Sequence, residues 1–173
     1  MKKIWLIAGI LVFIALIFSG CASKKKYDYS GAELKEISLS ENDVVGMTAK
    51  SESLIPKNES SPIPYYGYIK TFSNENFVGG SNEKGYIEFF SAVYVLDSEE
   101  NAKNFIKKET PGFRLLSVKA IGDESYVFSG QHNGKNLIMV RFRKRNIVSN
   151  NIFEGIDSNT AYNYARMLER KIV

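Results

Sequence analysis

The sequence predicts an α+β fold, an antiparallel sheet of about five to seven strands with two helices packed against it. Aromatic residues are abundant, with ten tyrosines and eleven phenylalanines, and such residues favour strands. The expected elements follow one another as strands, a helix after residue 97, a three-strand meander, and a helix after residue 157. Because strands come in runs and do not alternate with helices, this order is typical of an antiparallel sheet with helices lying on it.

Three strands are expected before the first helix, at residues 44–54, 65–73 and 86–96. Loops rich in proline, glycine and polar residues separate them. The third stretch, YIEFFSAVYVL, is apolar in both of its alternating sets of side chains. A strand that is apolar on both sides is buried on both faces, so we expect it in the interior of the sheet.

The first helix is predicted to open at Asp97, because Glu100 stands three residues later and completes a capping box. Pro111-Gly112 would end the helix. Its apolar stripe consists of Ala102, Phe105 and Ile106.

The meander is predicted at residues 126–130, 137–143 and 147–153. Asn133-Gly134 joins the first two strands and is the typical signal of a type I′ hairpin. Asp157 or Ser158 then caps the last helix. Apolar residues at i, i+3, i+4 and i+7 spacing define its buried side, namely Ala161, Tyr164, Ala165, Leu168 and Ile172.

The first 21 residues have the layout of an export signal. Lys2 and Lys3 form a basic head, residues 4–18 form an apolar run, and two small residues precede Cys21, the only cysteine. Phe18-Ser19-Gly20-Cys21 resembles the lipobox of prokaryotic lipoproteins, although leucine is usual where this chain has Phe18. The resemblance implies cleavage before Cys21, a lipid on Cys21, and a lipid anchor on the extracytoplasmic face of the cell membrane.

A single N-terminal transmembrane anchor is the alternative. Residues 4–18 would cover roughly 23 Å as a helix, less than the ~30 Å hydrocarbon core, although extension through Ala22 nearly closes the gap. We therefore expect a signal peptide at residues 1–20, a lipidated tether at residues 21–32, and one α+β domain at residues 33–173. The tether lysines, Lys24, Lys25 and Lys26, either contact anionic headgroups or keep the tether soluble.

The charge balance argues against a nucleic-acid partner. Removing Lys2 and Lys3 from the 23 basic residues leaves 21 against 19 acidic residues. Part of the basic character therefore belongs to the signal, and we expect no nucleic-acid binding. With no second cysteine, the domain is held by its core alone.

Two turn motifs carry a resemblance over residues 85–172. They are Gly122-Asp123-Glu124 and Arg143-Lys144-Arg145-Asn146, the second followed by the closing helix. In this order they resemble small extracytoplasmic domains of the PsbP/Mog1-like kind, which implies an accessory or binding role and supplies no catalytic residues. That pattern has glycine where this chain has Arg145, so we expect Asn146 to take the left-handed conformation.

Candidate catalytic residues are few. His132 is the only histidine and lies beside the hairpin turn, so a zinc ligand set or a Cys-His pair cannot be assembled. A Ser-His-Asp triad would place its base at an exposed hairpin tip. Glu99-Glu100 suits the first turn of a helix and Asp123-Glu124 suits a turn. We expect no catalytic site, no metal site and no cofactor.

Two sets of residues are candidates for binding. Arg141, Arg143 and Arg145 alternate along one strand and would present three guanidinium groups on one face. The alternative is a sheet edge kept soluble by charge. The second set is aromatic and is either a contact surface or part of the core: Tyr65, Tyr66 and Tyr68.

These patterns predict a membrane-anchored lipoprotein with a non-enzymatic binding or accessory domain. Its partners would be the membrane, through the lipid on Cys21, and an envelope protein or an anionic envelope component. A small cell-envelope enzyme that uses carboxylate chemistry is the second hypothesis. A pocket with two facing acids would favour the enzyme, and a solid core with an exposed aromatic or arginine face would favour the binding domain.

Overall fold

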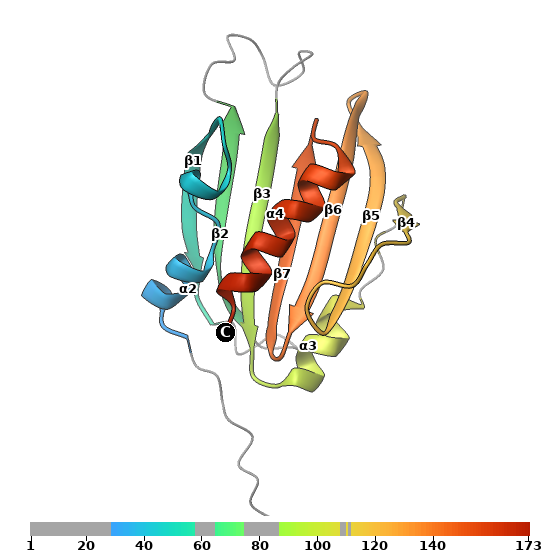
Figure 1. The fold of residues 1–173 in the computed structure, drawn as a ribbon. Helices are drawn as coiled ribbons and strands as arrows, with labels where there is room; N and C mark the ends of the chain where they lie inside the picture. The colour runs from blue at the N-terminus through green and yellow to red at the C-terminus, as the bar shows by residue number, and fades with distance from the viewer. Residues whose placement is uncertain (1–28, 58–64, 75–86, 108–109, 111) are drawn as a thin grey trace, which may run out of the picture.

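The computed structural model describes residues 29–57, 65–74, 87–107, 110 and 112–173, so Cys21 and the tether lysines lie outside it. The described residues contain a seven-stranded antiparallel sheet in the order β1-β2-β3-β7-β6-β5-β4 (Figure 1). The strands are β1 (Met47–Ile55), β2 (Tyr65–Asn74), β3 (Glu88–Leu96), β4 (Arg114–Leu116), β5 (Glu124–His132), β6 (Lys135–Lys144) and β7 (Ile147–Glu154). The helices are α2 (Gly31–Ile37), the 3-10 turn η1 (Glu41–Asp43), α3 (Glu99–Ile106) and α4 (Ser158–Lys171). The predicted α+β fold is confirmed, and β3 is an interior strand as expected.

The helices cover the two faces of the sheet unequally. α4 and α2 lie over one face, while α3 packs at one end of the sheet (Figure 1). The alternation along β3 shows that α3 lies on the opposite face. Val93 and Val95 belong to the core under α4, whereas Tyr94 and Leu96 pack with Ala102 of α3. We call the two sides the α4 face and the α3 face.

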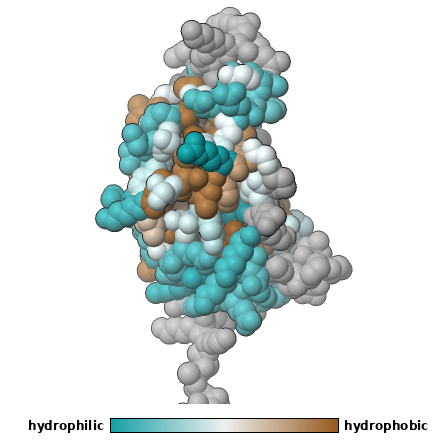
Figure 2. All heavy atoms as spheres, turned by 90° about the vertical axis from the view of Figure 1, so that its right-hand side faces the viewer, coloured by the Kyte–Doolittle hydropathy of each residue, from teal (hydrophilic) through white to brown (hydrophobic). Residues whose placement is uncertain are grey.

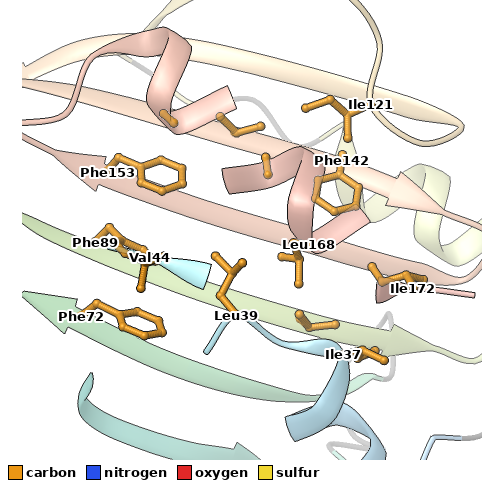
Figure 3. Close-up of a cluster of buried hydrophobic side chains, with 14 of the residues drawn as sticks. Ile37, Leu39, Val44, Phe72, Phe89, Ile121, Phe142, Phe153, Leu168 and Ile172 are labelled. Atoms are coloured by element: carbon orange, nitrogen blue, oxygen red, sulfur yellow. The ribbon is translucent and has the colours of Figure 1, made fainter. Parts of the chain in front are cut away.

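The main core lies between the α4 face of the sheet and the two helices above it. Phe72, Phe89 and Phe153 come from neighbouring strands and stack side by side, with ring centroids 4.5 and 5.1 Å apart (Figure 3). Leu168 and Ile172 reach the same cluster from the end of the chain and are fully buried. The apolar stripe predicted for the last helix is therefore the side that packs on the sheet.

The folded part begins earlier than the predicted boundary at residue 33. The Ser30 hydroxyl accepts a hydrogen bond from the Glu33 N–H at 3.2 Å, and the Glu33 carboxylate accepts one from the Ser30 N–H at 2.6 Å. This capping box opens α2, whose Leu34 and Ile37 enter the core, and Tyr29 packs against the same cluster. Sequence analysis missed α2 because a seven-residue helix supplies only two core contacts, which resemble loose alternation.

The helix expected after residue 97 is present but shorter at both ends. Ser98 caps α3, since its hydroxyl accepts a hydrogen bond from the Asn101 N–H at 3.0 Å. The predicted capping box of Asp97 and Glu100 is therefore wrong by one residue, and Asp97 forms an ion pair with Lys57 at 3.5 Å. The helix ends at Ile106, before the proline that was expected to stop it.

Both turns of the meander contain residues with positive φ. Asn133 and Gly134 have φ of 49° and 74°, which confirms the type I′ hairpin. In the second turn Arg145 has φ of 57°, so the expectation for Asn146 is wrong. The Asn146 side chain is instead buried and donates to the Leu96 carbonyl oxygen at 2.8 Å, which ties this turn to the end of β3.

Candidate functional site

The predicted row of arginines is divided among different environments. Arg143 is only 5% exposed, and its Nη1 donates to Asp123 Oδ2 at 3.1 Å and to the Arg145 carbonyl oxygen at 2.9 Å. Its Nε lies 3.7 Å from Glu124 Oε2. Arg145 lies in the turn after β6, and its Nη1 donates to the Val173 carbonyl oxygen at 3.0 Å. Both side chains are therefore engaged within the protein.

These contacts explain the two turn motifs. Asp123 accepts a hydrogen bond from the Arg145 N–H at 2.6 Å, which supports the left-handed conformation there, and donates its own N–H to the Arg143 carbonyl oxygen at 2.8 Å. Gly122 has φ of 62°, and a Cβ at this position would collide with the same Arg143 carbonyl oxygen. We call Gly122, Asp123, Arg143 and Arg145 the corner clamp, because they fasten the start of β5 to the end of β6.

Arg141 lies on the α3 face and contacts the end of α3. Its Nη1 is 3.4 Å from the Ile106 carbonyl oxygen at the end of α3, and its guanidinium lies 6.0 Å from the centre of the Phe128 ring. Burial lowers the pKa of Arg141. A cation at the last carbonyls of a helix is favourably placed in the field of the helix dipole. Arg141 thus holds α3 to the sheet, and the three arginines do not form one anion-binding row.

The three predicted tyrosines also point to different places. Tyr65 faces α3, where its ring centre lies 5.4 Å from that of Tyr94 and 5.5 Å from that of Phe105. Tyr66 and Tyr68 belong to the α4-face cluster, and the Tyr66 hydroxyl accepts a hydrogen bond from the Tyr29 N–H at 2.8 Å. No common surface is formed by these three residues.

Tyr68 is part of a polar cluster at the β1 edge of the sheet. Its hydroxyl donates to the Glu52 carboxylate, which also pairs with Lys35 at 2.7 Å and with Lys70 at 3.8 Å. Burial and the hydrogen bond to Glu52 raise the pKa of Tyr68. Hydrogen bonds from Lys35 and Tyr68 lower the pKa of Glu52. The members of this cluster satisfy one another.

The remaining titratable candidates lie apart. His132 is at the exposed hairpin tip, with Nδ1 3.2 Å from Glu154 Oε2. Glu99 and Glu100 stand in the first turn of α3. Within the described residues, no group of three or more His, Cys, Asp or Glu side chains is placed to hold a metal ion.

A different set of residues lines an open pocket beside the start of α4. β5 and β6 extend past the beginning of α4 (Figure 1). The pocket lies at this place on the α4 face and has a volume of about 510 Å³. That volume is in the range of small-ligand sites. Its apolar lining is Leu116, Ile138 and Ile156, and the rest of its lining is Ser129, Gly130, Gln131, Asn136, Asp157 and Ser158. We call it the α4 pocket.

The polar lining of the α4 pocket offers hydrogen bonds but no positive charge. Gln131 and Asn136 are paired across the β5–β6 ladder, so their amides stand next to each other on one face. In the described part of the chain, neither amide nor the Ser129 hydroxyl forms a hydrogen bond within the protein. Neighbouring amides and hydroxyls beside apolar side chains suit an uncharged ligand that has both polar and apolar groups.

The one carboxylate of the α4 pocket already has a structural role. Asp157 Oδ1 accepts the N–H groups of Asn159 at 2.9 Å and Thr160 at 3.1 Å, and Oδ2 accepts the Thr160 hydroxyl at 2.6 Å. These hydrogen bonds, with the Thr160 hydroxyl contributing most, lower the pKa of Asp157. Asp157 is the N-cap of α4 and not a proton-accepting base.

Sequence analysis missed the α4 pocket because its polar residues are ordinary surface residues in two separate segments. One signal was available. A two-residue turn at Asn133-Gly134 fixes the register of the hairpin, and this register places Gln131 opposite Asn136. The start of α4 lies beside this pair because of how the helix packs on the sheet, and local sequence patterns do not predict that packing.

The short edge strand β4 forms the border of the α4 pocket. Leu116 lines the pocket, while Leu115 and Val118 are 57% and 41% exposed. The view onto this side of the molecule shows apolar surface between hydrophilic regions (Figure 2). The pocket therefore opens next to an apolar edge.

Comparison with family models and curated proteins finds no match, and comparison with solved structures finds a similar chain. No family model matches the sequence, and no curated protein matches it. Among solved structures, the chain is similar to the extracellular domain of PknH from Mycobacterium tuberculosis, with a TM-score of 0.47 and 10% identity, over 83% of this chain and 91% of that chain. None of the helices in the described ranges is long and apolar enough to span a membrane.

Proposed function

We propose that the protein is a lipid-anchored, extracytoplasmic binding domain whose α4 pocket contacts a component of the cell envelope. The observation that carries the proposal is the lining of the pocket. Two neighbouring amides and a hydroxyl lie there beside three apolar side chains. In the described part of the chain, these polar groups form no hydrogen bonds within the protein. The anchor is proposed from the lipobox-like sequence that ends at Cys21.

The positions of the first described residue, Tyr29, and of the pocket fit this arrangement. α4 begins at the pocket and runs to the opposite end of the domain, over about 21 Å for its 14 residues. At that far end the Tyr29 hydroxyl donates to the Val173 carbonyl oxygen at 3.4 Å. The described chain therefore starts near the end of α4 and away from its beginning (Figure 1), where the pocket lies. A lipid anchor before Tyr29 would leave the pocket facing away from the membrane.

The ligand that we propose is an uncharged, hydrogen-bonding segment of an envelope polymer or an envelope protein. Arg143 and Arg145 are engaged in the corner clamp and Arg141 is engaged with α3, so they offer little to an anionic component. The resemblance of the turn motifs to PsbP/Mog1-like domains supports an accessory role of this kind. An enzyme that uses two carboxylates would need two acids facing one cavity, and the α4 pocket has Asp157, which is used as a cap.

The anchor is tested with Cys21→Ser. We expect this variant to lose metabolic labelling by fatty acids and to leave the membrane fraction, because the thiol that would carry the lipid is gone. The control is Ser23→Ala, which changes a tether residue and keeps the thiol. Labelling of Cys21→Ser at the level of the control would refute the lipid anchor.

The pocket is tested with a photo-crosslinking amino acid at Gln131 in cells. We expect a discrete adduct with an envelope component, since Gln131 lines the pocket. The matched control places the same amino acid at Lys50, an exposed residue of the opposite edge strand β1. Equal adducts at both positions, or none at Gln131, would contradict binding at the pocket.

A further inference from the structure

A second surface of the domain lies where the tether must join it. Leu54 is 55% exposed at the end of β1, beside a shallow depression. The residues that line this depression are Leu54, Ile55, Pro56, Lys57, Tyr66 and Gly67. We call it the β1-end surface. It is mainly apolar, with one lysine that is paired with Asp97 at 3.5 Å.

The β1-end surface is connected to the first described residue of the chain. The Tyr29 N–H donates to the Tyr66 hydroxyl at 2.8 Å. Tyr29 lies eight positions after Cys21, and a chain of that length spans at most about 26–29 Å when fully extended. With a lipid on Cys21, the β1-end surface is therefore held within a short distance of the headgroups, at the end of the domain from which the tether leaves.

We propose that the β1-end surface rests on the bilayer, with Leu54 at the boundary between headgroups and acyl chains. This inference rests on the proposed lipid anchor. Leu54 and Pro56 supply apolar contact, and the Tyr66 ring is of the amphipathic kind that is enriched at membrane interfaces. Lys57 stands at the border of the surface, where Asp97 balances its charge at 3.5 Å.

A contact of this size is weak, but the tether makes it sufficient to orient the domain on the membrane. A single exposed leucine and its neighbours would not hold a free protein on a vesicle. A tether of this length, however, keeps the two partners at an effective concentration on the order of millimolar, so a weak contact is made for much of the time. The consequence is an orientation: the domain would stand with the β1-end surface down and the α4 pocket outward.

The test uses the membrane-extracted, lipidated protein with a tryptophan reporter. Trp5 is the only tryptophan of the chain and belongs to the segment removed by cleavage before Cys21, so the mature wild-type protein has no tryptophan fluorescence of its own. Leu54→Trp places the reporter on the β1-end surface. Val45→Trp is the matched control, because Val45 is 89% exposed and precedes the other end of the same strand. Pro56→Trp is a second reporter if Leu54→Trp melts at a lower temperature than wild type.

The proteins are reconstituted into vesicles of phosphatidylcholine and phosphatidylglycerol with or without brominated acyl chains. We expect brominated lipid to remove most of the fluorescence at position 54 and none at position 45. Equal fluorescence of Leu54→Trp and Pro56→Trp in both kinds of vesicle, in protein that floats with the lipid, would overturn the docking and leave the anchor standing. Protein that does not float, or wild type whose Trp5 is still present and quenched, would overturn the lipid anchor and the docking with it.

Discussion

The corner clamp and the α4 pocket stand at opposite ends of the same pair of strands, and they use polar groups in opposite ways. In the clamp, Arg143 is buried and meets Asp123, and Asp123 also accepts the N–H of Arg145. In the pocket, the amides of Gln131 and Asn136 are paired by register but form no hydrogen bond within the described part of the chain. The clamp is closed on itself, and the pocket is open to a ligand.

This difference shows which residues are informative about function. The charged residues of the clamp attract attention in the sequence because they form turn motifs. Their charged groups form hydrogen bonds within the turns, since a buried guanidinium requires partners and an arginine with positive φ requires support for its backbone. The pocket residues are uncharged and ordinary in the sequence. What distinguishes them is that the fold leaves their hydrogen-bonding groups exposed beside apolar side chains.

The largest effect is expected for Gly122→Ala. The new Cβ would collide with the Arg143 carbonyl oxygen and would also have to adopt positive φ, so we expect a loss of about 3 kcal/mol or more in the free energy of unfolding. The control is Gly134→Ala, which has φ of 74° and no atom within 4 Å of the new Cβ, and should cost only about 1 kcal/mol. Urea denaturation measures both. Equal losses would show that the clamp is not tight.

Arg143→Met should have the next largest effect. It removes the buried guanidinium and its ion pairs with Asp123 and Glu124, at a cost of about 2–3 kcal/mol because both carboxylates retain access to water. Arg170→Met, at an exposed position of α4, should change stability by less than about 0.5 kcal/mol. An unchanged free energy of unfolding in Arg143→Met would show that the Arg143 side chain does not fasten the two strands.

The cap of α4 should give a smaller and pH-dependent effect. The folded pKa of Asp157 lies below the ordinary value of 3.8, so its ionised carboxylate stabilises the fold above pH 3.8, and this contribution is lost as the pH falls through the folded pKa. We expect Asp157→Ala to melt at a lower temperature than wild type at neutral pH. The difference should shrink in acid below pH 3.8. A difference independent of pH would exclude the ionised cap.

The smallest effect on stability is expected inside the pocket. Gln131→Ala and Asn136→Ala remove side chains without hydrogen bonds in the described part of the chain, so each should cost less than about 0.5 kcal/mol. Each should nevertheless abolish the adduct formed from a crosslinker placed at the neighbouring Ser129. A large loss of stability with unchanged crosslinking would reverse the assignment and make the pocket structural.

Several features of the domain were predictable because their causes are local. The type I′ turn follows from Asn133-Gly134, and the interior position of β3 follows from its two apolar faces. Asp157 was one of two expected caps for α4. One error was a local competition, and the other depended on a contact between distant residues. Ser98 caps α3 in place of Asp97, and Arg145 in place of Asn146 takes the left-handed conformation because Asp123, far away in the sequence, accepts its N–H.

By itself, the sequence determined the class of fold and the order of the longer strands and helices, because hydrophobic periodicity and turn residues act over a few neighbouring positions. The short helix α2 was not among them. Only the tertiary structure decided which polar side chains form hydrogen bonds within the protein and which remain available to a ligand. Whether a guanidinium is a binding group or a fastening depends on what lies within about 3 Å of it in space, as for Arg143. The same holds for Gln131, whose surroundings are set by where α4 begins to pack on the sheet.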